Sequence, residues 1–313
     1  MKRNPYQELV PILDRMQAAG ELEYIPNAPL APYSSFRIGG LADFAVWPHT
    51  RSALLDVLSA LRELEIRRDL FGNGSNVLFA DEGYRGVVIF TTKMNRILYR
   101  DGILWADAGV SFTGLAVRAL QEGLTGLEFA YGIPGSVGGA IYMNAGAYDG
   151  EISQVCVETT VYDPNYAILG GIGEVTGAAQ GFGYRTSVFQ SAPESVILGG
   201  KFRLKAGNPA EIKAKMDDLM ARRREKQPLE YPSAGSTFKR APGYFTGKLI
   251  QEAGLKGAMV GGAQVSEKHA GFVINRNGAT ARDVLALIEQ IKEQVVRQFG
   301  VEIECEVRII PAE

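Results

Sequence analysis

Hydrophobic positions along the chain follow two spacings, one typical of helices and one typical of strands. Apolar residues three and four positions apart predict helices at residues 6–19, 50–61, 111–122 and 280–299. Short apolar runs predict strands at residues 42–47, 69–71, 76–79, 86–90, 104–108, 155–162, 196–204, 259–265, 271–275 and 301–310. Residues 20–41 contain three prolines and predict a connector without regular structure. The chain is therefore expected to contain both helices and strands.

The character of the sequence changes at Asn208 and Pro209. Asparagine is a favoured helix cap and proline is favoured in the first turn of a helix, so a polar helix is expected to begin here. We therefore expect a first domain over residues 1–207 and a second domain over residues 208–313.

Composition and charge exclude several classes of protein. The chain carries 33 basic and 35 acidic residues, a net charge of −2, which argues against binding nucleic acid through overall charge. Two cysteines and two histidines supply neither a disulfide framework nor the usual ligands of a zinc site. We therefore expect a reducing, cytoplasmic compartment and no metal.

One uncharged stretch, residues 129–148, is long enough to raise the question of a membrane span. It contains Pro134 and five glycines, too many breaks for a helix that faces lipid. The basic residues at the start of the chain are not followed by an apolar run, so no signal peptide is expected. The stretch is interpreted as buried loop backbone around a ligand.

Glycine departs most from average usage: 37 of 313 residues, about 12%, against a usual ~7%. Glycine-rich segments fall at residues 72–76, 109–114 and 131–139, and residues 144–148 follow. Residues 72–76 suit either a hairpin turn, for which Asn-Gly is a strong signal, or a nest of backbone N–H groups around a phosphate. The later segments lead toward predicted helices, whose first amides favour an anion. Together they indicate one elongated, phosphate-bearing cofactor.

Two common nucleotide-binding motifs are excluded. The Rossmann fingerprint requires glycine at the position of Val77. A P-loop requires serine or threonine after its lysine, and Lys248 is followed by Leu249. Flavin adenine dinucleotide (FAD), held by a different fold, is the best remaining candidate.

Seven segments, in order along the chain, resemble the UDP-N-acetylenolpyruvoylglucosamine reductase (MurB) family. They are residues 34–40, 72–76 (Gly-Asn-Gly-Ser-Asn), 131–139, 182–187 (Phe-Gly-Tyr-Arg-Thr-Ser), 232–239, 261–271 and 304–308 (Glu-Cys-Glu-Val-Arg). The resemblance implies an α+β fold, with an FAD-binding PCMH-type two-part domain whose core spans about residues 34–205 and a smaller α+β substrate-binding domain after it. The short interval between Arg185 and Ser236 is similar to the shorter subclass that lacks an inserted tyrosine loop.

By this resemblance, the chain reduces the enolpyruvyl ether of UDP-N-acetylglucosamine to the lactyl ether, a step toward bacterial peptidoglycan. NADPH would reduce non-covalently bound FAD, and hydride would then pass to the enolpyruvyl β-carbon. We expect a cytoplasmic monomer whose partners are this UDP-sugar and NADPH, with no nucleic acid and no membrane. The residues implied to bind FAD are Gly72, Asn73, Gly74, Ser75, Asn76, Ile133, Pro134, Gly135, Ser136, Gly138, Gly139, Asn144 and Ala147.

Arg185, Ser236 and Glu306 match the family's catalytic residues. Hydride addition places negative charge on the α-carbon beside a carboxylate, so a preorganised cation and a hydrogen-bond donor are needed there. Arg185 would bind the carboxylate, Glu306 would donate to it as an acid of raised pKa, and Ser236 would return a proton to the α-carbon. The positions that contact substrate in the family are matched by Tyr184, Lys226 and Arg240.

Ordinary interpretations of these residues stay open from the sequence alone. Arg185 also suits a surface ion pair, Ser236 a turn, and Glu306 the exposed face of a final strand. His269 lies in a matching segment and also suits a structural role. Residues 169–181 are unusually rich in glycine and alanine for the family, which leaves their conformation open.

Two rival functions are compatible with a fold of this kind. One is another flavin oxidase or dehydrogenase, acting on a sugar alcohol or a lactone. The motifs around Ser236 and Glu306 disfavour it. The other is a non-catalytic regulator that binds a nucleotide sugar, and the joint presence of those two residues with Arg185 disfavours that.

Overall fold

The computed structural model describes residues 4–165 and 171–313, which divide into two compact units. The first unit consists of Met1–Ile25, Phe44–Asn73 and Gly86–Ala221. The second unit consists of Pro26–Asp43, Gly74–Arg85 and Arg222–Glu313. Each unit is thus built from three separate stretches of sequence. The single domain boundary near residue 207 stays a prediction.

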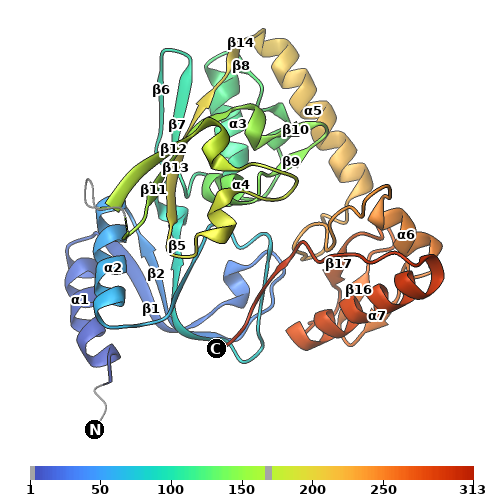
Figure 1. The fold of residues 1–313 in the computed structure, drawn as a ribbon, viewed down its shortest axis with the longest axis horizontal. Coiled ribbons are helices and arrows are strands. Elements are labelled where there is room, and N and C mark those ends of the chain that lie inside the picture. Colours follow the sequence, from blue (N-terminus) through green and yellow to red (C-terminus); the bar gives the residue numbers. More distant parts are fainter. Residues whose placement is uncertain (1–3, 166–170) are drawn as a thin grey trace. The chain divides into compact units, whose positions relative to one another are not determined.

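A four-stranded sheet with the strand order β1-β2-β5-β3 carries helices of the first unit. Its strands are β1 (Leu22–Pro29), β2 (Leu41–Pro48), β3 (Arg68–Phe71) and β5 (Tyr84–Phe90). Helices α1 (Tyr6–Ala18) and α2 (Arg51–Glu63) lie together beside these strands (Figure 1). Leu9 and Leu13 of α1 and Leu54 of α2 are fully or almost fully buried in the shared core. This agrees with the apolar spacing, and the Thr50 hydroxyl caps α2 by accepting from Ala53 N at 3.1 Å.

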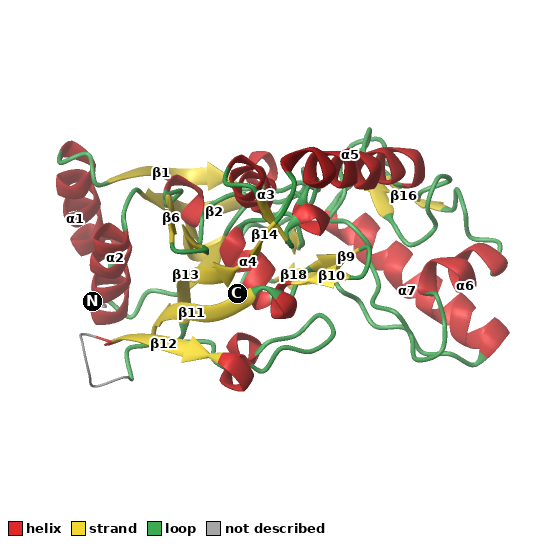
Figure 2. Ribbon diagram, turned by 90° about the horizontal axis from the view of Figure 1, so that it is seen from above, coloured by secondary structure: helices red, strands yellow, loops and turns green. Residues whose placement is uncertain are grey.

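A five-stranded sheet with the order β12-β11-β13-β7-β6 completes the first unit (Figure 2). Its strands are β6 (Ile97–Arg100), β7 (Ile103–Asp107), β11 (Cys156–Tyr162), β12 (Ile172–Thr176) and β13 (Val196–Arg203). Helices α3 (Phe112–Gln121) and α4 (Val137–Tyr142) share a core with it. Short strand pairs are formed by β8 (Leu124–Thr125) with β14 (Lys205–Ala206) and by β9 (Gly146–Ala147) with β10 (Gly150–Glu151).

The second unit has its own apolar core. A three-stranded sheet is formed by β15 (Met259–Val260), β16 (Ala263–Val265) and β17 (Val273–Asn275). Helices α6 (Thr246–Glu252) and α7 (Ala281–Phe299) belong to the same unit, and α7 buries the stripe Val284, Leu287, Ile288, Ile291 and Val295. Strand β4 (Val77–Phe79) pairs in parallel with β18 (Arg308–Ile310) at the end of the chain. Helix α5 (Pro209–Lys226) contains the position in the sequence, between Ala221 and Arg222, where the first unit ends and the second resumes.

The structure confirms the predicted helices and an α+β fold, but contains strands that were not predicted, among them β6 and β12, and differs from the predictions near both ends of the chain. The proline-containing connector includes β1, because prolines are tolerated on an edge strand and β1 is the edge of its sheet. The strand expected over residues 259–265 is two strands, separated by Gly261 and Gly262. The strand expected over residues 301–310 is regular only in β18.

The uncharged stretch at residues 129–148, interpreted as buried loop backbone that leads toward a helical pattern, contains helix α4 and the β9 strand beside its loops. In the described ranges of the chain, no helix is long and apolar enough to cross a membrane. Within the glycine- and alanine-rich residues 169–181, positions 169 and 170 lie outside the described residues. Those that follow form β12 and a 3-10 turn, Gly177–Gln180.

Candidate active site

The Gly-Asn-Gly-Ser-Asn segment is a loop between strands of two different sheets. Before it, β3 pairs with β5, and after it, β4 pairs with β18. The hairpin interpretation is therefore wrong. Among the described residues, the backbone amides of residues 72–76 donate to no protein acceptor. Consecutive amides of this kind form a nest that binds anions.

Two glycines in this loop leave no space for a side chain. A Cβ on Gly72 would lie 1.9 Å from the Ser136 Oγ. Gly74 has a positive φ of 59°, and a Cβ there would lie 2.2 Å from the Tyr33 carbonyl oxygen. Both positions require glycine because of close packing, which any larger residue would disrupt.

A second loop, residues 133–139, lies against the first. The Asn73 side-chain amide donates to the Pro134 carbonyl oxygen at 2.8 Å. Ser136 is buried and caps α4, accepting from Gly139 N at 3.3 Å. Within the described chain, the amides of Gly135 and Ser136 also lack a protein acceptor.

The first amides of α4 are not available to an anion, contrary to the sequence-based expectation. Val137 N donates to Val110 O and Gly138 N donates to Ala108 O, both at 2.8 Å. In α3, Phe112 N donates to Gly135 O at 2.9 Å. The donors left for an anion are therefore the loop amides and not the first amides of α4.

This arrangement fits a diphosphate-bearing cofactor such as FAD. A row of amides without protein acceptors, in two loops joined through Asn73, offers the donors that phosphate oxygens need. Gly72, Asn73, Ser75 and Asn76 are partly accessible. Ile133 and Ala147 are also partly accessible, and their contact with cofactor stays a prediction.

Asn144 differs from the other residues predicted to bind cofactor. Its side chain is fully buried, with 0% exposure. The amide Nδ2 donates to Gly183 O at 2.9 Å, and Oδ1 accepts from Ser153 N at 2.9 Å. Both ends of this side chain are therefore occupied by protein.

Arg185 lies at the corner of a tight turn in the first unit. Gly183 and Thr186 exchange two backbone hydrogen bonds, at 3.1 and 3.2 Å. Arg185 has a positive φ of 56°, in a position where a turn normally requires glycine or asparagine. Its Nη2 donates to Gly146 O at 3.1 Å. Tyr184, the other corner residue, is 49% exposed, and the Arg185 guanidinium carbon lies 5.2 Å from its ring centre.

Ser236 and Glu306 belong to the second unit, on two segments that run antiparallel. Glu306 N donates to Thr237 O at 2.8 Å, and Lys239 N donates to Glu304 O at 2.9 Å. Ser236 is exposed, one residue before the buried Thr237. The structure therefore brings the segment of the predicted proton donor next to the segment of the predicted acid.

Asn76, at the end of the cofactor loop, is tied to the same place. Its side-chain Nδ2 donates to Glu306 O at 3.2 Å, and its carbonyl oxygen accepts from Arg308 N at 3.1 Å. The Thr237 hydroxyl accepts from Val273 N at 2.9 Å, which fixes the Ser236 segment to β17. The second unit thus gathers Asn76, Glu306 and the Ser236 segment.

The remaining candidates lie on the surface of the second unit. Lys226 is exposed at the end of α5. Arg240 is exposed, with its guanidinium carbon 4.9 Å from the centre of the Phe245 ring. Burial lowers the pKa of His269, and its Nδ1 accepts from Gly271 N at 3.1 Å. This geometry is that of a neutral, structural histidine.

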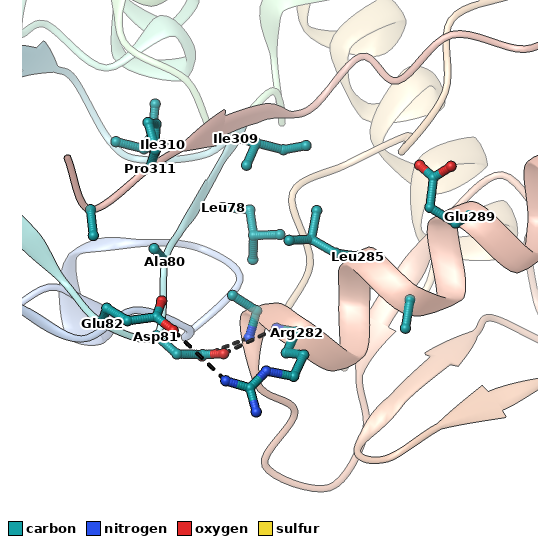
Figure 3. A pocket seen from close by; sticks show the side chains of 13 residues that line it. Leu78, Ala80, Asp81, Glu82, Arg282, Leu285, Glu289, Ile309, Ile310 and Pro311 are labelled. Carbon is teal, nitrogen blue, oxygen red and sulfur yellow. Dashed lines mark hydrogen bonds and ion pairs between the residues drawn. The ribbon is translucent and has the colours of Figure 1, made fainter.

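A separate pocket of about 530 Å³ lies in the second unit between β4, β18 and the first turns of α7 (Figure 3). The Asp81 carboxylate accepts from Ala281 N at 2.7 Å and from Arg282 N at 3.0 Å. Glu82 lies 3.8 Å from the Arg282 guanidinium. None of the residues predicted for the site lines this pocket.

Sequence reasoning missed the residues that hold the site in shape. The Thr237 hydroxyl links the Ser236 segment to β17, and the Gln190 side chain donates to Arg185 O at 3.1 Å. No motif points to Gln190, because its partners are backbone oxygens. Thr237 lies within a matching segment, but only the pairing with β17 shows what its hydroxyl does.

Family models match both parts of the chain. Residues 42–169 match the model described as "FAD binding domain", and residues 227–310 match "UDP-N-acetylenolpyruvoylglucosamine reductase, C-terminal domain". The fold and the first of these matches define an FAD-dependent oxidoreductase.

Similarity to individual proteins extends over nearly the whole chain. A UDP-N-acetylenolpyruvoylglucosamine reductase of Geobacillus thermodenitrificans is 47% identical over 308 residues, which is 98% of each chain. One from Clostridium novyi is 48% identical over 92% of each chain. The crystal structure of the enzyme from Thermus caldophilus superposes with a TM-score of 0.76 at 33% identity, covering 93% of this chain and 99% of that one. The chain belongs to the UDP-N-acetylenolpyruvoylglucosamine reductase family.

Proposed function

We propose that the chain reduces the enolpyruvyl ether of UDP-N-acetylglucosamine to the lactyl ether, with NADPH as the source of hydride. The observation that carries this proposal is the 47% identity, over 98% of both chains, to a reductase named for this substrate. Bound FAD supplies the two-electron chemistry, because a flavin accepts hydride from one substrate and gives it to another. We further propose that the protein works as a cytoplasmic monomer with small molecules as its partners.

Arg185 is proposed to bind the carboxylate of the enolpyruvyl group. When hydride adds to the β-carbon, negative charge appears on the α-carbon and spreads onto this carboxylate. A planar guanidinium matches the two carboxylate oxygens and stabilises that charge. The turn around Arg185 holds its backbone and Nη2 donates to Gly146 O, which supports a charge oriented before the reaction.

Ser236 is proposed to return the proton to the α-carbon. A serine hydroxyl is a weak acid, so it must be polarised by its neighbours or resupplied from water. Ser236 is exposed and its neighbour Thr237 is fixed to two segments, which supports access to solvent from a defined position.

Glu306 is proposed to act as a protonated acid that donates a hydrogen bond to the substrate carboxylate. Such a role favours the enol form of the intermediate. Tyr184, Lys226 and Arg240 are proposed as substrate contacts, and the ammonium of Lys226 suits the diphosphate. Lys226 and Arg240 are exposed, as residues that meet a soluble nucleotide must be.

Oxidation of NADPH by the purified protein tests the proposed reaction. We expect a yellow protein that oxidises NADPH continuously only when the enolpyruvyl nucleotide is supplied. UDP-N-acetylglucosamine without the enolpyruvyl group is the matched control and should give no turnover. Continuous NADPH oxidation with a sugar alcohol or a lactone, and none with the enolpyruvyl nucleotide, would contradict the proposal.

The variant Ser236→Ala separates the two half-reactions. We expect NADPH to reduce the flavin at nearly the wild-type rate, because Ser236 has no assigned role in that step. Reoxidation of the reduced flavin by substrate should slow by about 10²–10⁴-fold, the usual effect of losing an acid catalyst. Stopped-flow flavin absorbance measures both rates. An equal decrease of both rates would contradict the proposed role of Ser236 as the proton donor.

A further inference from the structure

The turn that carries Arg185 is held by two side chains, Asn144 from the segment after α4 and Gln190 from the 3-10 turn Val188–Ser191. Asn144 Nδ2 donates to Gly183 O at 2.9 Å, at the start of the turn. Gln190 Nε2 donates to Arg185 O at 3.1 Å and to Tyr142 O at 2.9 Å. The turn is therefore linked on both sides to residues 142–144.

The backbone of Arg185 needs such support. Its φ of 56° lies in the left-handed region, which side chains other than glycine, asparagine and aspartate rarely adopt. A residue held in this conformation persists only where the surrounding structure fixes it, and such residues cluster at functional sites. The two backbone hydrogen bonds between Gly183 and Thr186 close the turn but do not anchor it to the rest of the unit.

Asn144 is suited to be that anchor. It has 0% exposure, so water cannot replace either of its hydrogen bonds. Its Oδ1 accepts from Ser153 N at 2.9 Å, which fixes the orientation of the amide and leaves Nδ2 facing Gly183 O. An aspartate at this position would keep the size and the acceptor but would place a second acceptor against a carbonyl oxygen.

Gln190 is the second anchor, on the exposed side. It belongs to the 3-10 turn Val188–Ser191, and its amide nitrogen bridges the carbonyl oxygens of Tyr142 and Arg185. Ser187 adds a bond from its hydroxyl to the same Tyr142 oxygen at 2.7 Å. The carbonyl of Tyr142, the last residue of α4, therefore serves as the attachment point of the segment.

Helix α4 connects this attachment point to the cofactor loops. At its other end, the cap residue Ser136 packs against Gly72 so closely that a Cβ on Gly72 would lie 1.9 Å from its Oγ. One short helix thus lies between the contact of Ser136 with Gly72 and the turn that carries the arginine. Gly72, Ser136, helix α4 and the turn at residues 183–186 all belong to the first unit.

We propose that Asn144 and Gln190 are positioning residues that hold Arg185 in its left-handed turn at a fixed place relative to Gly72 and the loop at residues 133–139, within the first unit. The inference rests on the role of Arg185 given under the proposed function. Neither residue touches the substrate in this proposal; each acts on the reaction through the backbone of the turn. The predicted contact of Asn144 with the cofactor is replaced here by a contact with Gly183.

The variants Gln190→Glu and Asn144→Asp test this role. Each keeps the shape of the side chain and replaces the amide donor by an acceptor. We expect reoxidation of the reduced flavin by substrate to slow by about 10–100-fold, the scale of a small misplacement of a catalytic group. Flavin content and flavin reduction by NADPH should stay within about twofold of wild type, a split that general unfolding would not produce.

Two further variants sharpen the test. Gln190→Lys has a hydrogen-bond donor of similar reach, which Gln190→Glu lacks. Flavin reoxidation by substrate should therefore be almost as fast in Gln190→Lys as in wild type. Ser191→Ala removes a hydroxyl from the same 3-10 turn, one that donates to Val188 O within that turn, and should leave both half-reactions unchanged. Because Gln190 is exposed, its variants remain informative if Asn144→Asp fails to fold.

Arg185→Ala distinguishes failure of this inference from failure of the proposed function. If Arg185→Ala leaves reoxidation at the wild-type rate, the role of Arg185 is wrong. If Arg185→Ala slows reoxidation but Gln190→Glu does not, the positioning role is wrong. When both slow it, Gln190→Glu should have no further effect in the Arg185→Ala background. A full additional loss there would show that Gln190 acts by another route, and would also overturn the inference.

Discussion

At the residue scale, the conformation of the backbone decides the shape of the predicted cofactor site. Gly72 is the clearest example, because the Ser136 side chain occupies the place where its own Cβ would be. The packing keeps Gly72 close to the second loop, to which the neighbouring Asn73 is bonded. A methyl group in place of one Cα hydrogen of Gly72 would therefore force one of the two loops to move.

The substitution Gly72→Ala is expected to abolish FAD retention. A Cβ would lie 1.9 Å from Ser136 Oγ and 2.6 Å from Ser136 Cβ, so one of the two loops must move. Flavin absorbance per protein, after purification and gel filtration, measures the outcome. The double variant Gly72→Ala/Ser136→Gly removes both clashing atoms and should regain part of the flavin. Full flavin occupancy in Gly72→Ala alone would contradict this account of the loop.

At this scale, sequence reasoning identified residues with recognisable motifs and missed those whose partners are backbone atoms. Glycine clustering pointed to the loop at residues 72–76, and a resemblance pointed to Arg185 and Ser236. The bonds of Gln190 and Thr237 depend on which segments come together in space. Spacing along the chain contains no information about such contacts.

Among the elements, α7 shows how local sequence sets both ends of a helix. Thr280 and Asp283 form a reciprocal capping box at its start, and Gly300 ends it with a φ of 65°. The Asp283 carboxylate also accepts from Gly262 N at 3.1 Å, which ties the helix to the β15–β16 turn. Hydrogen bonds from the backbone N–H of Thr280, and then of Gly262, lower the pKa of Asp283.

The substitution Asp283→Ala is expected to lower stability in a pH-dependent manner. A carboxyl whose pKa is lower in the folded state stabilises the fold above its unfolded pKa of about 3.9, and this contribution is lost as the pH falls through the folded value. The urea midpoint should therefore fall at neutral pH, and its difference from wild type should shrink in acid. Glu293→Ala, on the exposed surface of the same helix, is the control. A difference that stays constant down to pH values below both pKa values would contradict the prediction.

Elements with strong local signals were predictable, whereas those that depend on partners were not. Helices α1, α2, α3, α5 and α7 follow from apolar spacing and caps that reside in the sequence itself. The final ten or so residues alternate like a strand, but only Arg308–Ile310 find a regular partner, in β4. Alternation shows which side chains are buried, not whether a neighbouring strand is available.

At the scale of the whole molecule, the two units are interleaved in sequence. The second unit takes Pro26–Asp43 and Gly74–Arg85 from the first third of the chain, and Phe36, Ile38 and Leu78 of these segments are buried in its core. These side chains pack with residues that come from the last third. A cut at one point in the sequence therefore cannot separate the units.

A fragment of residues 1–221 is accordingly expected not to be a stable FAD-binding protein. It retains Phe36, Ile38 and Leu78 but loses the residues that cover them, and exposed apolar clusters of this kind promote aggregation. Gel filtration and thermal unfolding, with the full chain as the reference, measure the outcome. A monomeric fragment that binds FAD with the affinity of the full chain would instead favour a self-contained first domain.

The pairing of β4 with β18 has a consequence for biosynthesis. Strand β4 follows the loop at residues 72–76 directly, and in the described chain its partner is β18, at residues 308–310. Asn76 in that loop is bonded to Glu306 and Arg308. A nascent chain lacks these partners until residues 306–310 have been synthesised and have left the ribosome, so we expect the protein to acquire its flavin only after that point.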